Sequence, residues 1–252
     1  MLLALRRGWV VIAVDWTGPH HSFVDLPLAA RFVLDGIRAG LSFEPAHLDL
    51  DAPVGLWGYS GGALATLFAA EQHPQYAPEL NIVGAAAGGG GVDITSSPEM
   101  FEAGNLLSGI PFGACIAASR TFPDFDLSGH LTAHGQAMVA AAEEMTMEQL
   151  AMSFPFVRMS SILSVPTISD LPGARAGFAA TRCGQATPAT PMFLYHAVHD
   201  QATEITDVDK LVQKYRGEEV DITYRRYRFG EHLIVMFRAV PAALRFLAKR
   251  LG

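Results

Sequence analysis

Apolar residues gather in short uninterrupted runs along the chain, separated by glycine-rich or polar turns. Such runs occupy residues 9–14, 54–57, 82–87 and 192–195, and a β-branched stretch follows at 220–226. A continuous apolar run bounded by turn residues predicts a strand that is covered on both faces, as strands of a parallel sheet are. We therefore expect these five segments to form the core strands.

Between these runs, apolar residues recur at helical spacing. The pattern predicts helices over residues 26–41, 63–72 and 233–251, with the second ending before Pro74 and the last kinked at Pro241. Proline ends or kinks a helix because it lacks the N–H that an intrahelical hydrogen bond needs. The alternation of strands and helices predicts an α/β protein with a mostly parallel, doubly wound sheet.

One long segment interrupts this alternation. Residues 96–189 are rich in Met, Phe, Pro and Gly and mix short helical stretches with loops, the clearest helix covering 134–152. An insertion between two strands of such a sheet predicts a cap over the carboxyl ends of the strands. We therefore expect an α/β core made of residues 1–95 and 190–252, with a mainly helical cap or lid at 96–189.

Composition excludes several classes of protein. Half of the 252 residues are hydrophobic and 17% are charged, which excludes an intrinsically disordered chain. Two cysteines, Cys115 and Cys183, are too few for a disulfide scaffold, although one bridge between them stays open. The 18 basic and 25 acidic residues give a net charge of −7, and no basic run stands out, so we expect no nucleic-acid partner.

The apolar surplus does not predict a membrane span. Residues 52–70 carry no charge and are long enough to cross a bilayer as a helix, but they contain Pro53 and several glycines. They are better interpreted as a buried strand, a glycine turn and a helix, so we expect no transmembrane segment. The first seven residues place their charges after their apolar residues, which is the wrong order for a signal peptide.

The strongest chemical motif is Gly58-Tyr59-Ser60-Gly61-Gly62, which joins the second predicted strand to the helix behind it. G-x-S-x-G between a strand and a helix is typical of a nucleophile elbow, whose serine stands exposed on a strained turn. The turn is so tight that a Cβ at either flanking glycine is expected to collide with the neighbouring strand or helix. The helix N-terminus favours developing negative charge. The alternative is a glycine-rich turn that binds a phosphate or nothing.

A serine nucleophile needs a histidine base further along the chain. His232 lies between the last predicted strand and the last helix, where a loop delivers an imidazole to the carboxyl edge of the sheet. His196 and His199, at the end of the preceding strand, are its main rivals. His20, His21, His47 and His73 are expected to be solvated, and His130 and His134 lie in the expected cap, where they are candidates to line a pocket.

The acid that orients the histidine is expected between the serine and the histidine in the sequence. Asp200 follows the predicted strand at 192–195 after the four residues 196–199. A carboxylate at the carboxyl end of a strand can accept the imidazole Nδ1–H. Glu204 and Asp207 in the same loop, and Asp93 after the glycine run, are also candidates for this role.

An oxyanion needs two backbone N–H donors. Gly61, the residue after the nucleophile, is expected to supply one. The loop that begins at Asp15 and ends at Gly18 follows a predicted core strand, and it is the upstream loop expected to supply the other.

These segments together resemble the secretory lipases of the lipase-A-like group, within the α/β-hydrolase superfamily. The similarity is carried by residues 58–63 (GYSGGA), 76–84 (YAPELNIVG), 15–18 (DWTG), 196–200 (HAVHD) and 231–233 (EHL). The resemblance implies a Ser60–Asp200–His232 triad, and an oxyanion hole made by the backbone N–H groups of Asp15 and Gly61. Members of that family have a substantial segment before the Asp-x-x-Gly loop, so we expect N-terminal strands of the full fold to be missing here.

The resemblance also implies an activity and a substrate class. The family cleaves carboxylic esters, including triacylglycerols, through an acyl-enzyme, and it uses its cap as a lid and acyl tunnel. We expect a lipase or esterase that needs no metal or organic cofactor, acts on small-molecule or lipid esters, and contacts a lipid interface transiently. An acyltransferase with the same triad and a catalytically inactive hydrolase fragment are the rival interpretations. The resemblance implies a secreted or cell-envelope protein. The first residues do not have the pattern of a signal peptide, so a cytoplasmic protein is the alternative expectation.

Overall fold

The computed structural model describes residues 1–18, 23–93 and 98–252. The expectations for His20 and His21, and the expected boundary between core and cap at residues 95 and 96, lie outside the described residues. The chain forms two compact units. Unit 1 comprises Met1–Trp16, Leu26–Val92 and Cys183–Gly252, and unit 2 comprises Thr17–Asp25 and Asp93–Arg182.

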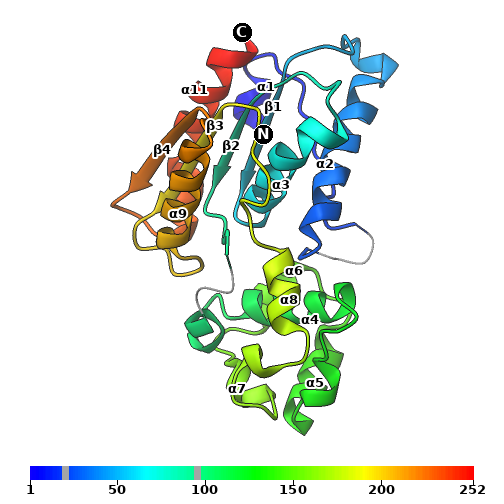
Figure 1. The fold of residues 1–252 in the computed structure, drawn as a ribbon, viewed down its shortest axis with the longest axis vertical. Coiled ribbons are helices and arrows are strands. Elements are labelled where there is room, and N and C mark those ends of the chain that lie inside the picture. The colour runs from blue at the N-terminus through cyan, green and yellow to red at the C-terminus, as the bar shows by residue number, and fades with distance from the viewer. Residues whose placement is uncertain (19–22, 94–97) are drawn as a thin grey trace. The chain divides into compact units, whose positions relative to one another are not determined.

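Unit 1 is built on a parallel sheet of four strands (Figure 1). The strands lie in the order β1 (Val54–Tyr59), β2 (Ile82–Gly88), β3 (Met192–Ala197) and β4 (Ile222–Tyr227), and every neighbouring pair is parallel. Their carboxyl ends therefore meet at one edge of the sheet, where parallel α/β proteins hold their sites. The predicted mostly parallel α/β sheet is confirmed.

One face of the sheet carries three helices. Helices α3 (Gly61–Tyr76) and α9 (Ile205–Gly217) contact the strands, and α2 (Leu26–Leu41) packs against α3. Ala85 and Ala87 of β2 point to this side, where they join the buried apolar side chains of the three helices in one cluster. Alanine is small enough to bring the helices close to the strand, so the layers of this face pack tightly.

The other face is covered by the end of the chain. Helices α10 (His232–Arg238) and α11 (Val240–Leu251) pack here. They cover Ala86, Phe193 and Tyr195, which alternate along the strands with the residues of the first face. Helices on both faces explain why β2 and β3 are continuous apolar runs: each strand is buried on both sides.

The first predicted strand is absent from the sheet. Residues 9–14 are described by the structure but are not paired as a strand. They lie instead along α2, where the side chains of Ile12 and Val14 occupy the space above Gly40 and Gly36. A Cβ at either glycine would lie 2.4 Å from these side chains, so the glycines allow the segment to dock on the helix.

A groove separates this segment from β1. Its volume is about 620 Å³, and apolar side chains of residues 9–14 and of β1 line it. β1 is therefore an edge strand among the described residues, and most of its positions are only half-buried. The prediction of a strand at residues 9–14 is wrong. An apolar run indicates that a segment is buried, but a strand also needs a neighbouring strand with which to form hydrogen bonds.

Two predicted helix ends are also corrected. Helix α3 continues through Pro74 to Tyr76, because the proline removes only its own N–H donor and the Ala77 N–H still donates to the His73 carbonyl at 3.0 Å. The predicted helix 233–251 is two helices that meet at Ala239, and Pro241 stands in the first turn of α11, where a missing N–H costs nothing.

Unit 2 is helical. It contains α4 (Gly109–Thr121), α5 (Ala133–Ala142), α6 (Met147–Ser153), α7 (Met159–Ile162), α8 (Ala174–Ala180) and the short 3-10 turns η2 (Pro98–Glu102), η3 (Ser128–His130) and η4 (Ile168–Asp170). The helix predicted at 134–152 is split into α5 and α6, because Thr146 forms a capping box with Gln149 that starts a new helix. Unit 1 also has α1 (Leu2–Leu5) and the turn η1 (Glu44–Ala46).

Aromatic rings fill the interior of unit 2. Phe112 is fully buried and packs edge-on against Phe154 at a centroid distance of 4.9 Å. Phe101 stacks on Phe178 at 5.6 Å. These side chains therefore form the unit's own core. Cys115 in this unit and Cys183 in unit 1 are both buried thiols.

Within the described ranges, no helix combines the length and the apolarity needed to cross a membrane. The longest helices there, α2 and α3, have 16 residues each.

Candidate active site

Ser60 stands at the sharp turn between β1 and α3 and is the N-cap residue of that helix. Its backbone has φ 54° and ψ −121°, a conformation that a side chain strongly disfavours. Strain of this kind costs on the order of 1–3 kcal/mol and persists only where the surroundings hold it. The Ser60 N–H donates to the Gly88 carbonyl at 2.8 Å, which fixes the turn to β2.

The two flanking glycines of the motif differ. A Cβ at Gly58 would lie 2.0 Å from the carbonyl oxygen of Gly62 and 2.5 Å from Thr66 Oγ1. A Cβ at Gly62 would meet nothing within 4 Å. The expected collision at both flanks is therefore correct for Gly58 and wrong for Gly62, because the helix turns that position away from the strand.

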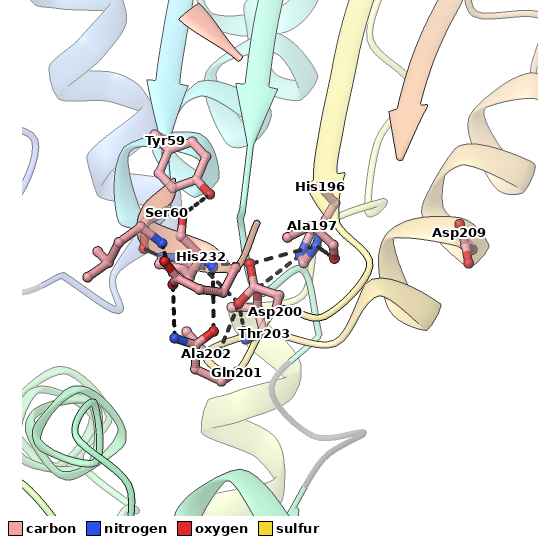
Figure 2. A network of polar contacts seen from close by, with 12 residues as sticks. Tyr59, Ser60, His196, Ala197, Asp200, Gln201, Ala202, Thr203, Asp209 and His232 are labelled. Carbon is pink, nitrogen blue, oxygen red and sulfur yellow. Dashed lines mark hydrogen bonds and ion pairs between the residues drawn. The ribbon is translucent and has the colours of Figure 1, made fainter. Parts of the chain in front are cut away.

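Three polar side chains from separate segments of the chain meet at the carboxyl edge of the sheet (Figure 2). The Nε2 atom of His232 lies 3.0 Å from Ser60 Oγ. On the other side of the ring, Nδ1 lies 2.8 Å from Asp200 Oδ2 and 3.0 Å from Oδ1. The Asp200 side chain is fully buried, and the His232 side chain is 4% exposed. An Nδ1–H that donates to the carboxylate leaves Nε2 as an acceptor that faces the serine hydroxyl.

The Asp200 carboxylate is held by its own loop. Oδ1 accepts the backbone N–H groups of Ala202 at 2.9 Å and Thr203 at 3.1 Å. Burial by itself raises the pKa of the Asp200 carboxyl, but the hydrogen bond and charge of His232, together with the Ala202 N–H, outweigh it. The net effect holds the pKa of Asp200 below its ordinary value, so the group is an anion at neutral pH.

His232 begins helix α10, and the preceding residue caps that helix. The Glu231 carboxylate accepts the N–H groups of Leu233 at 2.8 Å and Ile234 at 3.0 Å. Gln201, the neighbour of Asp200, donates to the same carboxylate at 3.0 Å. The loop with the carboxylate and the helix with the imidazole are thus connected a second time.

Tyr59, which precedes the serine, also contacts His232. Its hydroxyl donates to the His232 carbonyl at 2.6 Å, and the two rings lie 5.2 Å apart. The sequence motif assigns Tyr59 no role, because the residue before the serine carries no required side chain in the motif. The presence of an aromatic residue there is the only signal that the sequence offers.

His196, a rival for the base, lies on the side of Asp200 that faces away from Ser60 (Figure 2). Its ring is fully buried; Nδ1 donates to the Ala197 carbonyl and Nε2 accepts from Thr203 Oγ1, each at 2.9 Å. Nδ1 is also 3.8 Å from Asp200 Oδ2. Burial lowers the pKa of His196, which keeps the ring neutral. His196 therefore supports the Asp200 loop and does not face Ser60.

The rival acids lie in different surroundings. Glu204 is the N-cap residue of α9, and Asp207 in that helix pairs with Lys210 at 2.9 Å. Asp93 pairs with Arg182 at 3.3 Å. The remaining described histidines are exposed or bonded elsewhere; they are His47, His73, His130, His134 and His199.

Within unit 1, Gly61 lies next to Trp16, the residue that follows Asp15. The Gly61 N–H belongs to the first turn of α3, where intrahelical bonds leave backbone donors over. The Trp16 ring covers Gly61 so closely that a Cβ there would lie 3.0 Å from it. The role expected of the Asp15 N–H stays a prediction.

The glycine run that begins at the last residue of β2 makes room for two tyrosine rings. A Cβ at Gly88 would lie 2.0 Å from the Tyr195 ring, and a Cβ at Gly89 would lie 2.6 Å from the Tyr59 ring. Gly89 also has φ 63°, which glycine adopts without strain. The run therefore lets the tyrosines of β1 and β3 approach the end of β2.

Comparisons with known proteins agree with this architecture. A family model described as "Secretory lipase" matches residues 1–252. A "Probable inactive lipase" of Mycobacterium tuberculosis is 34% identical over 98% of this chain and 56% of its own length. "Lipase A" of Arthroderma benhamiae is 35% identical over 98% of this chain and 54% of its own length. The chain thus spans about half the length of these curated relatives.

A solved structure has a similar fold. The crystal structure of Candida antarctica lipase A superposes with a TM-score of 0.87 at 26% sequence identity, and the matched region covers 98% of this chain and 59% of the lipase chain.

Proposed function

Because the chain belongs to the secretory lipase family, we propose that it is a serine hydrolase that cleaves carboxylic esters through an acyl-enzyme on Ser60. The observation that carries the proposal is the continuous line of contacts from Ser60 Oγ to His232 Nε2 at 3.0 Å, and from His232 Nδ1 to Asp200 at 2.8 Å. An imidazole oriented by a buried carboxylate is the arrangement that activates a serine hydroxyl.

In the proposed reaction, Ser60 Oγ attacks the ester carbonyl carbon while His232 Nε2 takes the hydroxyl proton. Asp200 holds the tautomer and stabilises the imidazolium that forms. The backbone N–H groups of Gly61 and Asp15 stabilise the oxyanion of the tetrahedral intermediate. His232 then gives its proton to the leaving alcohol, and the acyl group stays on Ser60. A water molecule deprotonated by His232 releases the acid by the same steps.

The proposals for substrate and location rest on the family. We propose acyl esters, including triacylglycerols, as substrates, a lid role for residues 96–189, and export from the cell. The description of the family as secretory supports export. A series of p-nitrophenyl esters of increasing acyl length tests the substrate proposal, because an apolar acyl site gives kcat/KM that rises with length before it levels off.

The experiment that tests the reaction is labelling of Ser60 with a fluorophosphonate probe, together with hydrolysis of p-nitrophenyl butyrate. We expect Ser60→Ala to abolish labelling and to lower kcat by about 10⁴-fold or more. The control is Ser42→Ala, which removes an exposed serine hydroxyl just after α2 and is expected to behave as wild type. Hydrolysis that survives Ser60→Ala would show that another group performs the reaction.

A second candidate is a hydrolase fold without catalysis, which the name of the mycobacterial relative favours. Against it, Ser60, Asp200 and His232 are all present here and lie within hydrogen-bond distance of one another in series. Well-folded protein that neither labels nor hydrolyses any ester would support the inactive form.

A further inference from the structure

The side chain of Tyr59 contacts the base from the strand that carries the nucleophile. We propose that Tyr59 is a positioning residue, whose hydroxyl holds the backbone of His232 at the distance from Ser60 that proton transfer needs. This inference rests on the proposed function. The supporting contact is the hydrogen bond of 2.6 Å from Tyr59 Oη to the His232 carbonyl oxygen.

The direction of this hydrogen bond is fixed by its chemistry. A carbonyl oxygen only accepts, so the phenol must donate. Burial, followed by the negative charge of Asp200, raises the pKa of Tyr59, so the hydroxyl keeps its proton across the pH range of ester hydrolysis. Tyr59 therefore donates this hydrogen bond at every pH at which esters are hydrolysed.

Two neighbouring residues of one strand end therefore hold one residue of another element. Ser60 Oγ contacts the ring of His232 at 3.0 Å, and Tyr59 contacts the backbone of the same residue at 2.6 Å. The hydrogen bond from Tyr59 restricts the backbone at the start of α10. Because that backbone is held in place, the imidazole stays at hydrogen-bond distance from Ser60 Oγ. The Tyr59 ring, 5.2 Å from the imidazole and inclined by 52°, also occupies space beside it.

Tyr59 can hold His232 because its own ring is confined. Gly89 packs against the ring so closely that a Cβ there would lie 2.6 Å from it. The ring of Tyr195 lies 6.0 Å away on β3, and the hydroxyl of that tyrosine accepts a hydrogen bond from Trp57 Nε1 at 3.1 Å. A side chain restricted in this way loses little entropy when it forms its hydrogen bond, which is the requirement for preorganised catalysis.

The Tyr59 hydroxyl acts on the backbone of His232, so its removal is expected to affect the chemical step. In Tyr59→Phe the ring and its packing remain and only the donor is lost. We expect kcat for p-nitrophenyl butyrate and the fluorophosphonate labelling rate of Ser60 to fall by about 10- to 100-fold, because misplacement of a catalytic group by a fraction of an ångström has effects of this size. KM is expected to change by less than about twofold, since uniform binding is not altered.

Tyr224→Phe is the matched control. Its hydroxyl is half-buried and donates to Asp209 at 2.9 Å on the β4 side of unit 1. This variant loses one tyrosine hydroxyl bond without touching His232, so kcat and labelling rate are expected within about twofold of wild type. Equal losses in both variants would mean a general effect of losing a buried hydroxyl bond, and would overturn the inference.

A spectroscopic measurement separates this inference from the proposed function. The proton between His232 Nδ1 and Asp200 gives a low-field NMR resonance whose sharpness depends on how firmly the imidazole is held, whether or not the protein turns over esters. We expect a sharp signal in wild type and in Tyr224→Phe, and a broadened, faster-exchanging signal in Tyr59→Phe. Wild-type protein that shows no labelling refutes the proposed function, whereas an unchanged resonance and an unchanged labelling rate in Tyr59→Phe refute the role of Tyr59.

Discussion

The backbone strain at Ser60 is a property of one residue that can be measured as stability. Alanine at this position keeps the disfavoured φ of 54°, whereas glycine adopts it freely. We expect Ser60→Gly to be more stable than Ser60→Ala by about 1 kcal/mol, since relief of strain exceeds the extra unfolded-state entropy of glycine. Urea denaturation of the two inactive variants measures the difference. A more stable Ser60→Ala would mean that the turn holds no strain.

The residues that meet at the candidate site could be predicted from the sequence only where position along the chain carries information. Ser60, Asp200 and His232 each follow a predicted strand and appear in the expected order, and the structure brings them together. Tyr59 and His196 contact this group in ways that no spacing rule encodes. Their roles depend on which backbone carbonyl or carboxylate lies next to them in space.

At the scale of the element, the strand–turn–helix elbow has no room for a side chain at Gly58 but has room for one at Gly62, although both are glycines of the same motif. Gly58→Ala places a Cβ 2.0 Å from a backbone oxygen of α3, so we expect a loss of about 3 kcal/mol or more in unfolding free energy. Gly62→Ala enters open space inside the helix and is expected to gain about 0.5–1 kcal/mol from helix propensity. Thermal and urea unfolding of both variants test the pair. Equal destabilisation would contradict the geometry.

The sequence predicts the position of an element well where that element is packed in the core. The runs that became β2 and β3 are buried almost throughout, and helix α2 has the bounds that its periodicity predicts. The run at 9–14 has the same apolar character, but it lies on α2 and not in the sheet. Whether an apolar segment pairs is decided by the strand beside it, and that information is not contained in the segment.

At the scale of the molecule, the segment that leads into β3 is fixed by one buried carboxylate. Glu71 of α3 accepts the N–H groups of residues 184–186 at 2.7 to 3.1 Å and the Tyr215 hydroxyl at 2.5 Å. Burial raises the pKa of Glu71 against the effect of these four donors. The segment before β3 is thereby joined to α3, and the Tyr215 hydroxyl joins α9 to the same carboxylate.

Global stability is expected to depend on pH through His196. Its pKa is lowered in the folded protein from an ordinary value of 6.5, so below that pH the unfolded chain binds a proton that the folded chain does not. The His196 contribution is therefore lost as pH falls from about 6.5 toward the lower folded-state pKa. Unfolding free energies of wild type and His196→Gln, measured from neutral to mildly acidic pH, should show a shallower slope in the variant. Parallel slopes would contradict this assignment.

The glycines at the end of β2 have a consequence for how this protein can vary. Gly88 and Tyr195 fill one volume between them, as do Gly89 and Tyr59. In each pair, the side chains that one position tolerates therefore depend on the residue at the other position, which lies far away in the sequence. A mutational scan that changes one position at a time should record Gly88 as invariant, whereas a library that shortens Tyr195 at the same time should recover side chains there.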